Sequence, residues 1–413
     1  MTPREERGLV IAATCKLERK ADGTWRVPAQ TSKTVVAYTV NLKTKACTCL
    51  DHTDGGFVCK HFYAASIVHR REVQPNGDVI DTKTFTVTER KTYSQDWPAY
   101  NLAQSIEKDR VQELLFDLCK GLAEPERKPT RGQRPHTFRD SIFASVFKVY
   151  STFSSRRFSS DLREAHKRGY LSKEIPGNKV PAFMENPAFT PIFKALVAKS
   201  AAPLKAVETE FAIDSSGFST NTFERWFDEK WGVTKLKHVW VKTHIASGRK
   251  THAVTAVRIL DKDAADAPQF VPLIKETARS FTIGEVSADK AYGSLENFEA
   301  VAEMGAQAYI AFKSNATGAV GGAFEKAFHY FQFKQGEYMK HYHLRSNVES
   351  TFSSVKRVFG HSVRSKNETA MTNEVLCKLV CHNLACLVHA QCELGIESEF
   401  WPDSPQLQLA HAG

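Results

Sequence analysis

The order of strands and helices expected in the C-terminal half constrains the fold more than any other feature of the sequence. Three strand-like segments (207–214, 237–247 and 251–260) precede a helix (268–281), a strand (283–289), a helix (294–305) and a strand (306–313). About 20 residues of looser sequence follow, and then a helix that carries Glu349. Acidic residues stand at the end of the first strand (Asp214), after the fourth strand (Asp289) and on this last helix. The order predicts an α/β domain with a mixed five-stranded sheet and flanking helices.

The helix around Glu349 is expected to have two distinct faces. At about 100° per residue, Tyr342, Arg345, Glu349 and Lys356 fall within one narrow stripe. A separate apolar face is formed by Leu344, Val348, Phe352, Val355 and Phe359. Taken alone, the pattern is also that of an ordinary amphipathic helix with a charged face.

Together, the three acids favour a metal-dependent reaction on phosphate. In an RNase H-like order of elements, Asp214, Asp289 and Glu349 would converge at the carboxyl edge of the sheet. Three carboxylates there can hold two hard divalent ions, Mg²⁺ or Mn²⁺, that bridge one phosphate. Arg345 and Lys356 would supply positive charge toward DNA phosphates, where a tyrosine can hydrogen-bond or stack.

At these residues the sequence resembles the IS4-type DDE transposases of insertion sequences. Tyr342-x2-Arg345-x3-Glu349-x6-Lys356 has the spacing of the YREK signature of that family, and FAIDSSGFS (211–219) and SADKAYGS (287–294) fit its two aspartate motifs. The resemblance implies an RNase H-like catalytic domain that hydrolyses DNA at the ends of a mobile element. The freed 3′-hydroxyl would then attack target DNA.

Residue by residue, the resemblance implies a catalytic, metal-binding triad of Asp214, Asp289 and Glu349. It also implies contacts from Tyr342, Arg345 and Lys356 to the element's end. The sequence departs from some members because only 60 positions separate Asp289 from Glu349. The looser stretch 314–335 is expected to be too short for the β-rich insertion that those members carry.

A cysteine and histidine cluster near the N-terminus predicts a structural zinc site. Cys47-x-Cys49 and Cys59-x-His61 supply three thiolates and one imidazole, the ligand set of a closed tetrahedral zinc. His52 is a rival for the fourth ligand, and the alternatives are core cysteines or a redox pair. The pattern resembles the SWIM zinc finger, which implies one structural Zn²⁺ in a module that binds DNA or protein.

Positive charge is concentrated in one part of the chain. The formal net charge is +10, and residues 127–168 contain eleven Lys or Arg against three acids. One interpretation is a solvated helical face with a linker at 124–135. The other is a surface for the nucleic-acid backbone, with Arg156 and Arg157 among the residues that contact DNA.

Four regions are expected along the chain. They are a small β-rich, SWIM-like zinc-finger domain (1–95, with strands near 9–18, 34–42 and 84–89), a helical, basic region that binds DNA ends (96–204), the catalytic domain (205–395) and a tail (396–413). Cys377, Cys381, Cys386 and Cys392, on the final apolar helix, are expected to pack as small hydrophobes.

The predicted function is therefore transposition. The chain is expected to bind terminal inverted repeats and target DNA as a homodimer, with no small-molecule substrate. No apolar run reaches the roughly 18 residues of a membrane span. The resemblance to the transposases of insertion sequences implies a prokaryotic, cytoplasmic protein associated with the nucleoid. Two alternatives remain: a domesticated, non-catalytic DNA-binding regulator, and an RNase H-like nuclease without strand transfer.

Overall fold

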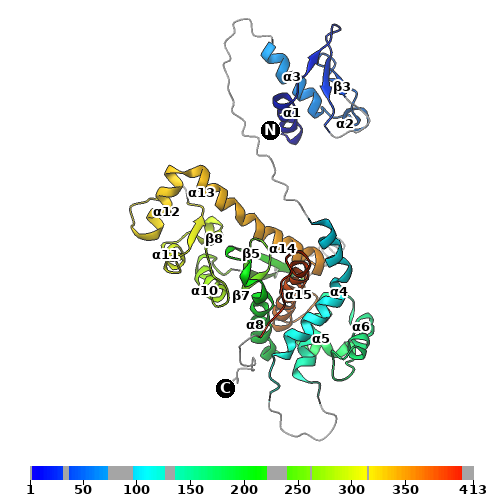
Figure 1. Ribbon diagram of the computed structural model, residues 1–413, viewed down its shortest axis with the longest axis vertical. Coiled ribbons are helices and arrows are strands. Elements are labelled where there is room, and N and C mark those ends of the chain that lie inside the picture. The colour runs from blue at the N-terminus through cyan, green and yellow to red at the C-terminus, as the bar shows by residue number, and fades with distance from the viewer. Residues whose placement is uncertain are drawn as a thin grey trace, which may run out of the picture. The chain divides into compact units, whose positions relative to one another are not determined.

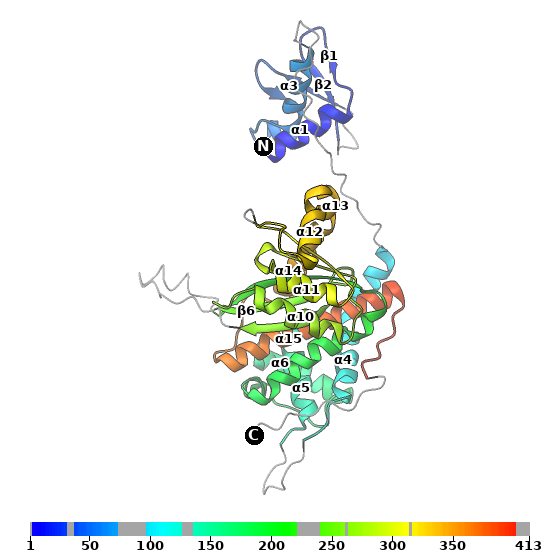
Figure 2. The same cartoon turned by 90° about the vertical axis from the view of Figure 1, so that its left-hand side faces the viewer.

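The structure, a computed structural model, describes residues 2–30, 37–72, 96–125, 135–220, 240–260, 263–313 and 316–401. The chain divides into two compact units, Met1–Ser94 and Gln95–Gly413 (Figures 1 and 2).

The first unit combines a small antiparallel sheet with helices. Its elements are α1 (Pro3–Thr14), β1 (Glu18–Arg19), β2 (Trp25–Pro28), β3 (Ala37–Asn41), β4 (Ala46–Cys47), α2 (Leu50–Thr53) and α3 (Lys60–Glu72). The strands pair in the order β1-β2-β3-β4. Trp25, Val27 and Val40 are buried between the sheet and the helices, so this unit has a core of its own.

The strand expected at 9–18 is wrong over most of its length, because residues 3–14 are helical. Thr2 caps the helix: its hydroxyl accepts from the Glu5 amide, and the Glu5 carboxylate accepts from the Thr2 amide. This capping box, with Pro3 at the first helical position, is a strong start signal for a helix. The strand expected at 84–89 lies outside the described residues.

The N-terminal part of the second unit is helical, as expected. It contains α4 (Trp97–Lys120), α5 (Phe138–Ser151), α6 (Ser155–Lys167), α7 (Val180–Met184) and α8 (Thr190–Ala201). Short 3-10 turns occur at Gly177–Lys179, Pro187–Phe189 and Ala202–Ala206. Residues 126–134 of the expected linker lie outside the described residues.

The sheet of the second unit has the predicted mixed order. Its strands are β5 (Glu210–Ser219), β6 (Trp240–Gly248), β7 (Val254–Leu260), β8 (Glu285–Ala288) and β9 (Gln307–Ile310). They are ordered β7-β6-β5-β8-β9, with antiparallel pairing on the β7-β6-β5 side and parallel pairing on the β5-β8-β9 side. Helices α10 (Ala267–Ala278) and α11 (Leu295–Glu303) supply the connections. The RNase H-like fold class is thus confirmed.

The stretch expected to be loose contains a helix. Helix α12 (Gly322–Phe333) precedes α13 (Gln335–Tyr342), a 3-10 turn (His343–Arg345) and α14 (Ser346–Phe359). Phe312 follows β9, and the centre of its ring lies 5.2 Å from the ring centres of Phe324 and Phe328. Aromatic side chains at helical spacing therefore fold α12 back onto the end of the sheet, and the expectation of a loose segment over 314–335 is wrong.

Helix α15 (Glu368–Leu394) is the central helix of the second unit. It packs against α4, α5, α8 and β7 (Figure 1). By length and composition it could span a membrane, but 72% of its most apolar window is buried inside this unit. Cys377 and Cys381 are fully buried on it, as expected of core residues. One hydrophobic core therefore joins the helical region to the sheet.

Candidate catalytic edge and metal centre

Asp214 and Asp289 occupy matching positions on neighbouring parallel strands. Ile213 of β5 pairs with Ala288, the last residue of β8, so an aspartate follows each of the two paired residues along the chain. Adjacent strands are about 4.8 Å apart, which sets the separation of the two backbones. The first strand was predicted to end at Asp214, but β5 continues to Ser219, and over these residues β6 is its one partner strand among the described strands. The parallel part of the sheet ends at Ile213, and that end defines the edge.

A buried tyrosine holds the loop that follows Asp289. The Asp289 carboxylate accepts from the Lys290 amide at 2.7 Å and caps the 3-10 turn Lys290–Tyr292. The Tyr292 hydroxyl lies 3.0 Å from His244 Nδ1 on β6, and the Asn297 side chain donates to the Tyr292 carbonyl at 2.6 Å. The loop is therefore fixed to a strand on the other side of β5.

His244 belongs to a polar network behind the edge. It is fully buried and pairs in register with Ser215, next to Asp214. Burial lowers the pKa of His244 to about 4. Its Nδ1 is 3.8 Å from an Asp266 oxygen, which accepts from Lys242 Nζ at 2.8 Å. Sequence patterns place Lys242 and His244 near the sheet but do not predict that they form a network with Asp266 and Tyr292.

The charged stripe around Glu349 is held together by its own contacts and is tied to the sheet through Lys356. Arg345 donates to Glu349 at 2.8 Å and to the Tyr342 hydroxyl at 3.1 Å. Lys356 Nζ donates to Ser216 Oγ at 2.6 Å, two residues beyond Asp214 on β5. Tyr342 ends α13 and Arg345 precedes α14, so the four residues share one nearly continuous helical segment. On the predicted apolar face, Val348, Phe352, Val355 and Phe359 are buried, and Leu344 is half-buried.

The three carboxylates interact electrostatically. Partial burial raises the pKa of Asp214, and the charges of Asp289 and Glu349 raise it further against the opposing charge of Arg345. The three groups do not lie within 4.8 Å of one another in the part of the chain that the structure describes. Glu349 is instead paired with Arg345, which offsets part of the repulsion. Oxygen donors that repel one another fit a hard divalent cation, because a bound cation would remove that repulsion.

The cysteine cluster of the first unit comes together as a four-ligand set. Ligand atoms of Cys47, Cys49, Cys59 and His61 all lie within 4.8 Å of one another, and all four residues are buried. A hydrogen bond between the thiols raises the pKa of Cys47 and lowers that of Cys59. The rival ligand His52 instead lies 2.9 Å from the Phe57 carbonyl. Three thiols and an imidazole in a closed, buried cluster fit tetrahedral zinc.

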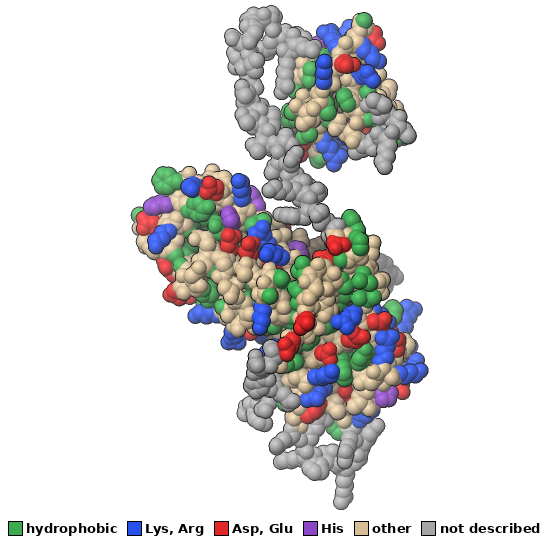
Figure 3. Space-filling model, viewed as in Figure 1, with side chains coloured by type: hydrophobic (Ala, Val, Ile, Leu, Met, Phe, Trp, Pro, Cys, Tyr) green, Lys and Arg blue, Asp and Glu red, His purple; other side chains and the backbone are tan. Residues whose placement is uncertain are grey.

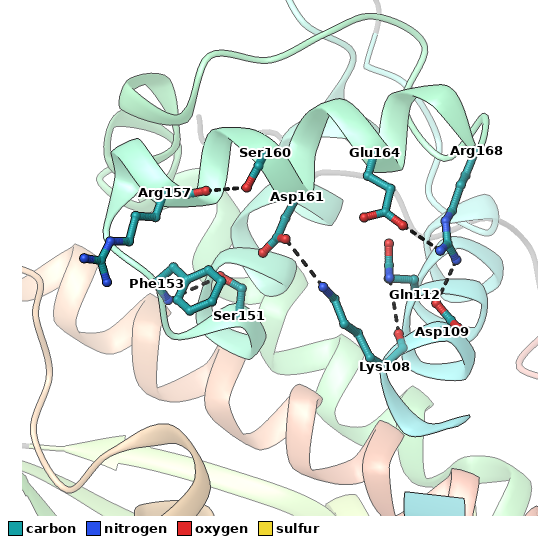
Figure 4. Close-up of polar contacts among 10 residues, drawn as sticks. All are labelled: Lys108, Asp109, Gln112, Ser151, Phe153, Arg157, Ser160, Asp161, Glu164 and Arg168. Atoms are coloured by element: carbon teal, nitrogen blue, oxygen red, sulfur yellow. Dashed lines mark hydrogen bonds and ion pairs between the residues drawn. The ribbon is translucent and has the colours of Figure 1, made fainter. Parts of the chain in front are cut away.

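The basic segment divides into paired and unpaired cations. Arg168 contacts Asp109 and Glu164, and Lys108 contacts Asp161, so α4 and α6 are joined by ion pairs (Figure 4). Lys and Arg side chains alternate with acids over this face in Figure 3.

Arg156 and Arg157, at the start of α6, are exposed and have no ion pair to any described residue. Figure 4 shows Arg157 pointing away from α4. Arg163 and Lys167, further along α6, are also exposed and have no ion pair to a described residue, so the cations available to an outside partner extend along α6.

Comparison with known proteins gives one family match. Residues 205–384 match the family described as transposase DDE domain, which supports a DDE transposase. No curated protein sequence matches the chain. Among solved structures, the chain is similar to a piggyBac transposase in a synaptic complex with hairpin DNA, at 12% identity over 70% of this chain and 76% of that chain, with a TM-score of 0.36.

Proposed function

We propose, from the match of residues 205–384 to the transposase DDE domain, that this chain cuts and joins DNA with Asp214, Asp289 and Glu349 as its catalytic carboxylates. The observation that carries the proposal is the register of β5 and β8, which puts two aspartates side by side at the end of a parallel pair. Glu349 adds a third carboxylate, whose charge raises the pKa of Asp214.

The three carboxylates would hold two Mg²⁺ or Mn²⁺ ions. Ions bound there would supply an activated water or 3′-hydroxyl and stabilise the leaving oxygen. The chain's own residues orient the DNA: Arg345 and Lys356 carry positive charge along the helix that bears Glu349, and Tyr342 positions the Arg345 guanidinium. With cations and metal at one edge, a DNA phosphate would be bound with its scissile bond beside the carboxylates.

The remaining parts of the chain would bind and organise DNA. We propose an IS4-type element, with the region 96–204 gripping the terminal inverted repeats through residues that include Arg156 and Arg157. The first unit would be a SWIM-like module, stapled by one Zn²⁺ on the Cys47 cluster, that contacts DNA or protein. Because both element ends must be cut together, the active form would be a homodimer on DNA, acting in a prokaryotic cytoplasm.

A strand-nicking assay on DNA that contains an element end tests the catalytic assignment. With Mg²⁺ or Mn²⁺ the parent should nick the end and join it to a plasmid, and Asp289→Asn should abolish both activities. Glu296→Gln is the matched control, since Glu296 is an exposed acid on α11 without a described ion pair. Nicking by Asp289→Asn at the parent rate would refute the triad. Nicking without joining would make the chain a nuclease, and binding without nicking a regulator.

A further inference from the structure

A cavity beside the end of β5 carries more positive than negative charge. It has a volume of about 220 Å³ and lies between the α5–α6 turn, the end of α14 and the start of α15. Its lining includes Lys148, Arg364 and Lys378, with Glu374 as the one acid. Ser154 and Phe153 at its rim are exposed.

The single acid is already fully engaged. The Glu374 carboxylate accepts from the amides of Arg364 and Ser365 and from the Ser365 hydroxyl, at 2.8 to 3.0 Å. Lys378 is almost completely buried and donates to the carbonyls of Gly360 and Ser362. The Glu374 carboxylate is therefore occupied by hydrogen bonds from Arg364 and Ser365, and Lys378 Nζ lies 3.8 Å from its Oε1.

The other two cations have no carboxylate partner among the described residues. Lys148 donates to the Phe153 carbonyl, and Arg364 to the Thr152 carbonyl. Burial lowers the pKa of Lys148, and the neighbouring charge of Arg364 lowers it further. Two adjacent cations that repel each other favour an anion between them. The exposed Arg156 and Arg157 follow within the first turn of α6, which holds no acid.

β5 connects this cavity to the candidate catalytic edge. Beyond Asp214, β5 continues through Ser216, which accepts a hydrogen bond from Lys356. The ring centre of Phe218, two residues further on, lies 5.4 Å from Lys356 Nζ and 5.3 Å from Lys378 Nζ. Its last residue, Ser219, exchanges backbone hydrogen bonds with His361 and Val363, next to Arg364. Five residues of strand cover about 17 Å, or about five phosphates along one DNA strand.

We propose that this cavity binds the DNA backbone about five to seven phosphates from the scissile phosphate, with Lys148 and Arg364 as the contacts. Arg157, two residues after the lining residue Ser155, would contact the same backbone outside the cavity. The inference rests on the proposed function and adds the path of the duplex across the second unit. Cations along this path, Lys356 and then the pair at the cavity, would bind a continuous backbone that follows the direction of β5.

The proposed path of the DNA backbone, from the catalytic edge along β5 to the cavity, can be tested by DNA binding to the full chain, without DNA cutting. The affinity for an end-containing duplex is measured by fluorescence anisotropy at several salt concentrations, with Ca²⁺ in place of Mg²⁺. Lys148→Gln and Arg157→Gln should each reduce the slope of log K against log salt by about 0.9, the value for one phosphate contact. Lys148→Arg should keep the parent slope. Lys205→Gln is the matched control, since Lys205 is an exposed cation before the opposite end of β5.

A shortened duplex locates the contact. On DNA cut back to fewer than about five base pairs on the side toward the cavity, parent and Lys148→Gln should bind equally well. Ethylation of phosphates five to seven positions from the nick should interfere with binding by the parent.

Three outcomes would overturn the path. One is an unchanged slope for both Lys148→Gln and Arg157→Gln in proteins that melt like the parent. A second is that Lys148→Gln weakens binding of free inorganic phosphate but leaves the salt slope of DNA binding unchanged. The cavity would then be a site for a free anion and not for DNA. The third is a parent that does not bind end-containing DNA at all, which alone would also refute the proposed function.

Discussion

Lys356 on α14 donates a hydrogen bond to Ser216 on β5, two residues beyond Asp214. The contact joins the helix that carries Glu349 to the strand that carries the first aspartate. Because Lys356 is partly buried, its pKa is lowered by desolvation, and the Ser216 hydroxyl supplies a hydrogen-bond acceptor for its ammonium. Under the proposed function, a DNA phosphate would supply a second acceptor.

Substitutions at Lys356 and Ser216 should distinguish the effect of the lysine charge on nicking from the effect of the hydrogen bond. Hydrogen bonds to charged groups contribute about 1.5 to 3 kcal/mol, so Lys356→Gln should slow nicking by roughly tenfold to a hundredfold. Ser216→Ala removes only the hydroxyl and should slow nicking much less. Single-turnover nicking with saturating protein measures both, and equal losses in the two variants would contradict a role for the charge.

Tyr292→Phe should impair nicking while leaving DNA affinity unchanged. The substitution removes the hydroxyl that meets His244 Nδ1, and His244 Nε2 already has no described partner. A buried polar group left unsatisfied costs about 1 to 3 kcal/mol and would loosen the loop that begins at Asp289. The expected signature is a lower nicking rate at an unchanged dissociation constant, both measured on the same duplex. Weaker DNA binding in place of a slower rate would show that Tyr292 contacts DNA.

The second unit should lose stability as the pH falls from 6.5 to 4. Burial lowers the pKa of both His244 and His382 to about 4, below the usual 6.5. Between these values the unfolded chain binds more protons than the folded one, so acid favours unfolding by at most about 3 kcal/mol for each histidine. Thermal melting across this pH range measures the effect.

His382→Gln is the variant for this test. It should flatten the pH dependence of melting by about half, because one of the two buried histidines is then removed. A dependence as steep as that of the parent would show that other groups dominate acid unfolding.

Zinc should stabilise the first unit alone. Metal analysis should find about one Zn²⁺ per chain, and Cys59→Ser or a strong chelator should remove it and unfold that unit. Cys15→Ser is the control, because Cys15 lies in the same unit outside the four-ligand cluster. Calorimetry should show the transition of the second unit unchanged. Full zinc retention in Cys59→Ser would refute the ligand set.

Sequence patterns predicted the succession of strands and helices that forms the second sheet, although the first strand continues to Ser219 instead of ending at Asp214. They did not predict α1 as a helix, since the apolar run around Ile11 also suits a strand and only the Thr2 capping box decides the matter. Hydrophobic periodicity also could not predict that Asp214 aligns with Asp289. That alignment depends on the register in which two strands 75 residues apart pair with each other. Arg364 gave no signal, since its importance arises from proximity to Lys148 in a cavity formed by distant segments.

The core that α15 shares with the helical region and the sheet has a consequence for where a DNA strand would be cut. The helices and the acidic edge cannot slide past each other without breaking that packing. The protein would then act as a ruler: the distance from the gripped sequence to the nick is built into the fold, and inserting a few base pairs between them would misplace the cut by the same number.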